Sequence, residues 1–144
     1  MGFAFHTYLI APDDQLGRLA GAKFFRMLRD PEAHRLPQFA GQRVRMASIV
    51  VELANRAPVR IVRRTFAILA FDRDGRLDLQ RFGQQQAALA EAAMAPVFGG
   101  AERNETIVDA ASRFVAQGGQ WRPTAKLART IDEAAMGRLP FRRV

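Results

Sequence analysis

The sequence contains no cysteine, and its 144 residues include one tryptophan, one tyrosine and two histidines. Without cysteine the chain can form no disulfide bond, no thiolate metal site and no cysteine nucleophile. It also contains no His-Glu-x-x-His pair of zinc ligands and no glycine-rich phosphate loop. We therefore expect no metal and no cofactor, and we favour a binding protein over an enzyme.

Long apolar runs are also absent. None approaches the roughly 18 residues that a helix needs to cross a bilayer. Residues 1–7 are mostly apolar, but they lack the basic leader of a secretion signal and are soon followed by Pro12. These features predict a cytoplasmic protein without membrane insertion.

The composition is that of a globular protein. Hydrophobic residues make up 49% of the chain and charged residues 25%. A length of 144 residues is close to the commonest size of one domain. We expect residues 1–144 to fold as a single domain, and no motif is specific enough to indicate a family.

Positive charge exceeds negative charge, with 22 cations, 14 anions and a formal net charge of +8. Residues 43–81 carry nine cations and four anions, and residues 118–144 carry six and two. All the cations are arginines except Lys23 and Lys126. The guanidinium group suits phosphate and carboxylate, and a basic surface attracts polyanions such as nucleic acid. A genome rich in G and C also raises the ratio of arginine to lysine, so that ratio alone indicates no function.

A long β-hairpin is the clearest element. Residues 43–53 and 59–71 are rich in β-branched and apolar side chains, and residues 54–58 between them are typical of a turn. A register centred on Arg56 places Glu52 opposite Arg60, where opposite charges attract. The same register pairs Leu53 with Val59 and Ser48 with Arg64.

Arginines gather at the turn end of this hairpin. We expect Arg56, Arg60 and Arg64 on or near one side, where they could contact the phosphates of nucleic acid. The alternative is a solvated hairpin end whose arginines protect a sheet edge from aggregation. Including the basic C-terminal tail, the candidate site residues for an acidic partner are Arg56, Arg60, Arg63, Arg64, Arg142 and Arg143.

The other elements predict an α+β fold: a small antiparallel sheet, formed by an N-terminal strand and the hairpin, packed against about four helices. The strand covers residues 3–10, and both of its faces are apolar enough for an interior position in the sheet. The first helix begins at Asp13 or Asp14 and runs to residue 30. Helices 82–94 and 105–117 follow, and the last begins near Pro123 or Thr124. Its inward side chains are Leu127, Ile131, Ala134 and Ala135.

Three hypotheses for function follow from these patterns. The leading one is a small basic module that binds an acidic protein or nucleic acid through the hairpin arginines. The second is an enzyme or small-ligand protein with a pocket near His6 and Tyr8, where the histidine could act as a base. The third is an assembly subunit that forms a homo-oligomer through an exposed strand, or through Gly17 and Gly21 on one face of the first helix.

Overall fold

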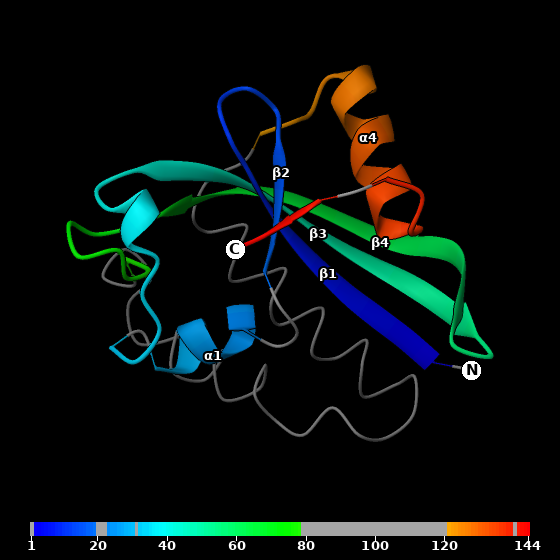
Figure 1. Cartoon of the computed structure of the whole chain (residues 1–144), viewed down its shortest axis with the longest axis horizontal. Helices are drawn as coiled ribbons and strands as arrows, with labels where there is room; N and C mark the ends of the chain where they lie inside the picture. The colour runs from blue at the N-terminus through cyan, green and yellow to red at the C-terminus, as the bar shows by residue number, and fades with distance from the viewer. Residues whose placement is uncertain (1, 20–22, 31, 79–120, 140) are drawn as a thin grey trace.

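The computed structural model describes residues 2–19, 23–30, 32–78, 121–139 and 141–144. Five strands form one mixed sheet in the order β4-β3-β1-β2-β5, and its two longest strands form the hairpin (Figure 1). All neighbours are antiparallel except β2 and β5, which are parallel. The strands are β1 (Gly2–Ile10), β2 (Leu16–Leu19), β3 (Arg43–Ala54), β4 (Ala57–Ala70) and β5 (Arg142–Arg143).

The N-terminal strand is confirmed. β1 pairs with β3 on one side and with β2 on the other, so it has the interior position that its two apolar faces predict. Leu9 faces one core of the protein, and its neighbour Tyr8 faces the other.

The helix predicted from Asp13 or Asp14 is wrong over its first half. Instead, residues 11–15 form a tight turn in which Asp14 has a φ of 64° and its amide donates to the Ala11 carbonyl at 2.8 Å. Aspartate tolerates this left-handed conformation better than most residues, so it suits a turn as well as a helix cap. The chain then returns along β1 as strand β2, and a short helix, α1 (Lys23–Arg29), follows.

The expected α+β fold, with a three-stranded antiparallel sheet and about four helices, is therefore wrong, and the described residues are mostly β. The described residues contain five strands, the α-helices α1 and α4 (Ala125–Ala135), and a 3-10 turn, η1 (Pro37–Phe39). The helices expected at 82–94 and 105–117 lie outside the described residues. No helix of the described part is long and apolar enough to cross a membrane.

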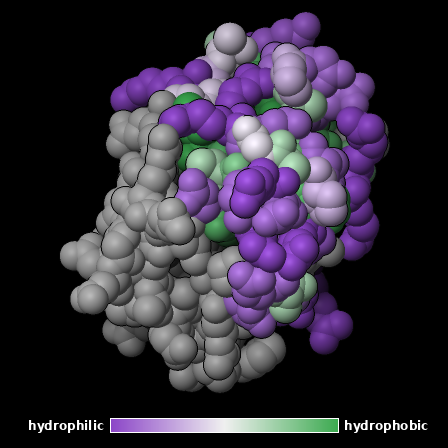
Figure 2. Space-filling view, turned by 90° about the vertical axis from the view of Figure 1, so that its left-hand side faces the viewer, coloured by the Kyte–Doolittle hydropathy of each residue, from purple (hydrophilic) through white to green (hydrophobic). Residues whose placement is uncertain are grey.

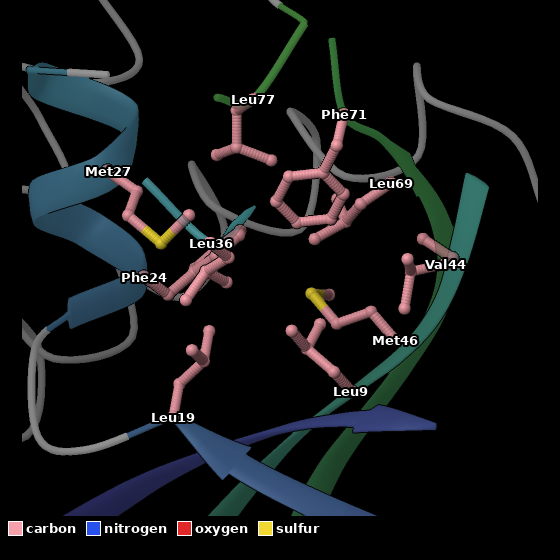
Figure 3. Close-up of a cluster of buried hydrophobic side chains, with 11 residues drawn as sticks. Leu9, Leu19, Phe24, Met27, Leu36, Val44, Met46, Leu69, Phe71 and Leu77 are labelled. Atoms are coloured by element: carbon pink, nitrogen blue, oxygen red, sulfur yellow. The ribbon is translucent and has the colours of Figure 1, made fainter. Parts of the chain in front are cut away.

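One face of the sheet packs against α1 and the loops around η1. Leu9, Leu19 and Met46 project from the strands toward Phe24 and Met27 of the helix (Figure 3). The loop residues Leu36, Phe71 and Leu77 close the same cluster. Figure 2 views the molecule from the left-hand side of Figure 1. The described surface on this side is mostly hydrophilic, and apolar residues show in smaller areas between polar ones.

Helix α4 covers the opposite face of the sheet (Figure 1). Its start is confirmed, because the Thr124 hydroxyl accepts a hydrogen bond from the Leu127 amide at 3.2 Å and caps the helix. Its inward stripe is confirmed as well. The buried residues of α4 are Leu127, Ile131, Ala134 and Ala135, and they pack on Tyr8, Ile10, Ala47, Ile49 and Val51 of the sheet.

The hairpin turn is tighter than the predicted turn of residues 54–58. Only Asn55 and Arg56 separate β3 from β4, and their φ angles are 51° and 65°. Positive φ at both central residues is the geometry of the two-residue turn whose twist matches that of the flanking strands. Arg56 is therefore exposed at the tip.

Two β-bulges change the predicted register of the hairpin. Val59 and Val62 of β4 have no partner in β3, and they are the exposed large hydrophobic residues of the described chain, at 53% and 38% exposure. The predicted register holds only between them, where the pairs are Val51–Ile61 and Glu52–Arg60.

On either side of the bulges the predicted pairs are wrong by one residue. Leu53 pairs with Pro58 rather than with Val59, and Ser48 pairs with Thr65 rather than with Arg64. Because side chains alternate between the faces of a strand, each extra residue moves those beyond it to the other face.

The C-terminal residues form the edge of the sheet opposite β4. β5 runs beside β2, and the Val144 amide donates to the Arg18 carbonyl at 2.8 Å. A side chain at Gly17 would collide with the side chain of Val144, so this glycine leaves room for that residue. The predicted helix face with Gly17 and Gly21 is wrong for Gly17, which lies in a strand, and Gly21 lies outside the described residues.

Candidate functional site

The structure separates the predicted site residues into groups. Arg64 pairs with Ile49 of β3 and so lies on the face that carries α4. Arg63 pairs with Val50 on the opposite face. Arg60 also falls on that opposite face, because the bulge at Val62 stands between it and Arg64.

Arg142 and Arg143 lie on β5, at the far edge of the sheet from the hairpin. The Arg142 guanidinium donates to the Gln15 side-chain oxygen at 2.6 Å. The structure therefore does not bring the tail arginines to the same surface as Arg60 and Arg64.

Arg60 and Arg64 both contact carboxylates. The Arg60 guanidinium lies 2.6 Å from Glu52, as the predicted register requires. Arg64 reaches across to α4 and donates two hydrogen bonds to Asp132, each 2.9 Å long. The hydrogen bonds to Asp132 raise the pKa of Arg64 above its ordinary value. This fork-to-fork pair joins α4 to β4 at the surface.

Helix α4 and the segment before it add cations that the sequence did not lead us to predict as site residues. Lys126 and Arg129 are three residues apart on α4, on the side away from the buried stripe, and Arg122 lies in the segment that precedes the helix. All three are exposed, and none forms a salt bridge with another described residue. For Lys126 and Arg129, helical spacing is the signal that could have identified them.

A groove of about 310 Å³ runs between β4 and α4, and we call it the arginine groove. It brings two predicted residues together with two that the sequence did not suggest. Arg129 and Arg138 form no salt bridge with any other described residue. The charged side chains that line the groove are Arg60, Arg64, Arg129, Arg138, Asp132 and Glu133.

The electrostatics of the arginine groove favour an anion. Asp132 is already neutralised by Arg64, and Glu133 is the other carboxylate that lines the groove. Arg60 is paired with Glu52, so Arg129 and Arg138 remain against Glu133 and leave a surplus of positive charge. Because guanidinium groups bind phosphate oxygens in pairs of hydrogen bonds, the groove fits phosphate better than it fits a neutral ligand.

A second hollow, which we call the aromatic pocket, lies at the start of α4. Its volume is about 630 Å³, and Phe66, Trp121, Arg122 and Pro123 line it. From the sequence we would expect a tryptophan in a helix connection to pack between helices. Among the described residues Trp121 packs on the sheet, where its indole N–H donates to the Met46 carbonyl at 3.2 Å, and the preceding expected helix lies outside them.

The second hypothesis depended on a pocket near His6 and Tyr8. Both side chains project from β1 toward the α4 face, and Tyr8 is completely buried. The His6 Nδ1 atom and the Tyr8 hydroxyl are buried without a hydrogen-bond partner among the described residues. Neither residue lines the arginine groove or the aromatic pocket. Neither lines either of two further surface pockets, which lie beside Gln15 and Arg142.

Burial controls the protonation of this pair. Burial and the nearby positive charge of Arg18 lower the pKa of His6 from 6.5 to about 4. Burial also raises the pKa of the Tyr8 hydroxyl, an effect that Arg18 partly opposes. Both side chains are therefore neutral at pH 7, and burial weakens His6 as a base.

This shift predicts that stability falls in mild acid. The unfolded chain takes up a proton on His6 near pH 6.5, whereas the folded chain does so only near pH 4. The free energy of unfolding should therefore fall by about 1–2 kcal/mol as pH drops from 7 to 4.5, a value reduced for the partial exposure of His6. Denaturant titrations at several pH values measure this fall.

A substitution at His6 tests this assignment. His6→Asn should flatten the pH dependence of the free energy of unfolding between pH 5 and 7. Equal curves for the wild type and His6→Asn would contradict the assignment to His6.

Metal ligands and similarity to known proteins give no further guide to the site. No group of three or more metal-ligating side chains occurs within the described part of the chain. No protein-family model, no curated protein and no solved structure matches the chain. The proposals below therefore depend on the geometry and charge of the described residues.

Proposed function

We propose that this protein is a non-enzymatic module that binds an acidic partner through the arginine groove, and that the partner is nucleic acid. The observation that carries this proposal is the surplus of arginine in the groove, with Arg129 and Arg138 free of salt bridges to the other described residues. Each phosphate that such a group neutralises releases condensed counterions, which favours binding.

The cations continue beyond the groove. Lys126 extends the positive charge along the exposed side of α4 toward its N-terminus, and Arg122 is exposed in the segment that precedes the helix. At about 1.5 Å per residue, the eleven residues of α4 span about 16 Å. A linear polyanion matches this arrangement better than a small anion, because it can contact cations along the whole helix.

Replacement of Arg129 and Arg138 by glutamine tests the proposal. The double variant should bind a fluorescently labelled oligonucleotide about tenfold more weakly at 50 mM salt. The slope of log affinity against log salt should become shallower by about 1.5–2, since two phosphate contacts are lost. Fluorescence anisotropy over a series of salt concentrations measures both quantities.

Two further variants sharpen this test. Arg143→Gln removes an exposed arginine from the opposite edge of the sheet, so it should leave the affinity nearly unchanged. Asp132→Asn removes a negative charge and releases the Arg64 guanidinium, so it should strengthen binding. Absence of oligonucleotide binding by the wild type at 50 mM salt would refute the proposal, and salt-dependent binding of polyglutamate alone would identify an acidic protein as the partner.

A further inference from the structure

We propose, on the basis of the nucleic-acid function above, that the ligand is single-stranded and that one of its bases stacks in the aromatic pocket. The pocket holds two aromatic rings beside Arg122, and its volume lies within the usual range for ligand sites. Aromatic rings next to cations are the combination with which proteins hold single strands.

The tryptophan at this pocket is held in place before any ligand arrives. Its N–H is bound to Met46, and the ring of Phe66 meets it edge-on with centroids 5.7 Å apart. The Arg45 guanidinium lies 5.3 Å from the centre of the indole ring. Because three contacts fix its orientation, Trp121 loses little conformational freedom when a base stacks on it.

The pocket and the arginine groove follow each other along the same two elements. Phe66 of the pocket and Arg64 of the groove are two residues apart on one face of β4. Trp121 and Arg122 directly precede α4, and the groove lies farther along that helix. A strand whose base enters the pocket can therefore continue with its phosphates along α4 into the groove.

A pocket for a base followed by a groove for phosphates disfavours binding of a duplex. In a double helix the faces of the bases are stacked on their neighbours, so a base can enter the pocket only after it leaves the stack. A single strand presents its bases without this cost, and every base has a face that can stack on an aromatic ring. We therefore expect little sequence preference and a clear preference for single strands.

Trp121 is the one tryptophan of the chain, so its fluorescence reports on the pocket directly. Titration with an oligothymidylate of about ten nucleotides should quench this emission, because a base stacks on the indole. Inorganic polyphosphate should bind the groove without quenching, since it carries charge but no base. A duplex of the same length should bind about tenfold more weakly than the single strand.

Phe66→Leu is the matched variant, because it removes one ring of the pocket and keeps the tryptophan probe. It should weaken binding of the single strand about tenfold and leave binding of polyphosphate unchanged. If this variant does not fold, the quenching of Trp121 and the comparison of single strand with duplex in the wild type still test the inference.

The outcomes distinguish the two proposals. Salt-dependent oligonucleotide binding without quenching, or with equal affinity for duplex and single strand, would overturn the base-stacking inference and leave the proposed function intact. Absence of binding to either nucleic acid at 50 mM salt would overturn both.

Discussion

Replacement of Gly75 by alanine should lower the free energy of unfolding by about 3–5 kcal/mol. Gly75 has a φ of 82°, a conformation that costs a residue with a side chain about 1–2 kcal/mol. A Cβ atom at this position would also lie 2.6 Å from the Leu36 carbonyl oxygen and 2.9 Å from the Pro37 nitrogen. These are backbone atoms, so the loop cannot relieve the collision by a change of rotamer.

The loss should extend beyond the turn itself. The Leu36 amide donates to the Gly75 carbonyl at 2.8 Å, and Leu36 is part of the core beneath α1 (Figure 3). A shift of either backbone segment therefore disturbs a hydrogen bond and a buried side chain together.

Gly41 provides the control for this prediction. Its φ is 71°, but no atom lies within 4 Å of the place that a Cβ would occupy. Gly41→Ala should therefore cost only the conformational term, about 1 kcal/mol. Urea denaturation followed by circular dichroism measures both variants, and equal losses would show that the collision with residues 36 and 37 is unimportant.

Replacement of Ile131 by alanine should lower the free energy of unfolding by about 2–4 kcal/mol. Ile131 is completely buried between α4 and the sheet, so its removal loses hydrophobic contacts and leaves a cavity. Because α4 supplies one wall of the arginine groove, loosening this helix should also disturb the arrangement of the groove side chains.

Val62 is the matched exposed residue. It is 38% exposed at a bulge, so Val62→Ala should change the free energy of unfolding by less than about 0.5 kcal/mol. Thermal and urea denaturation of both variants test the difference. A loss below 1 kcal/mol for Ile131→Ala would contradict the packing of α4 on this face.

The parts of the fold that could be predicted are those with one dominant pattern. α4 has a capping threonine followed by apolar residues at helical spacing, and no other structure satisfies both. In β1 and in both strands of the hairpin, apolar residues either alternate with polar ones or follow one another over nine or more positions. In these elements local preference and tertiary packing agree.

β2 was missed because its four residues contain no such pattern. Leu16 and Leu19 are three apart, which fits a helix face as well as the two ends of a short strand. The strand exists because Asp14 closes a turn and Arg45 holds it, with its guanidinium 2.6 Å from the Ala11 carbonyl and 2.9 Å from Asp14. Arg45 is 31 residues away in sequence, so this tertiary contact has no local signal.

The candidate site was predicted in part for a similar reason. The hairpin pattern identified Arg60 and Arg64, but the position of α4 against β4 depends on packing between distant segments. Arg129 and Arg138 join the site only through that packing. Arg142 and Arg143 were predicted as site residues but lie at the opposite edge of the sheet. The charge pattern could not show this, because it does not give the order of the strands.

The bulge at Val62 decides which face of the sheet each hairpin arginine occupies. If Val62 were paired in the ladder instead of bulged, side chains would alternate without a break over the four steps from Arg60 to Arg64, and both guanidinium groups would project from the same side. The exposed end of the ribbon would also be flatter, and flat ribbon ends recruit further strands from other molecules. The bulge at this valine thus keeps one arginine for Glu52 and the other for Asp132, and it gives the ribbon end a bend that discourages polymerisation.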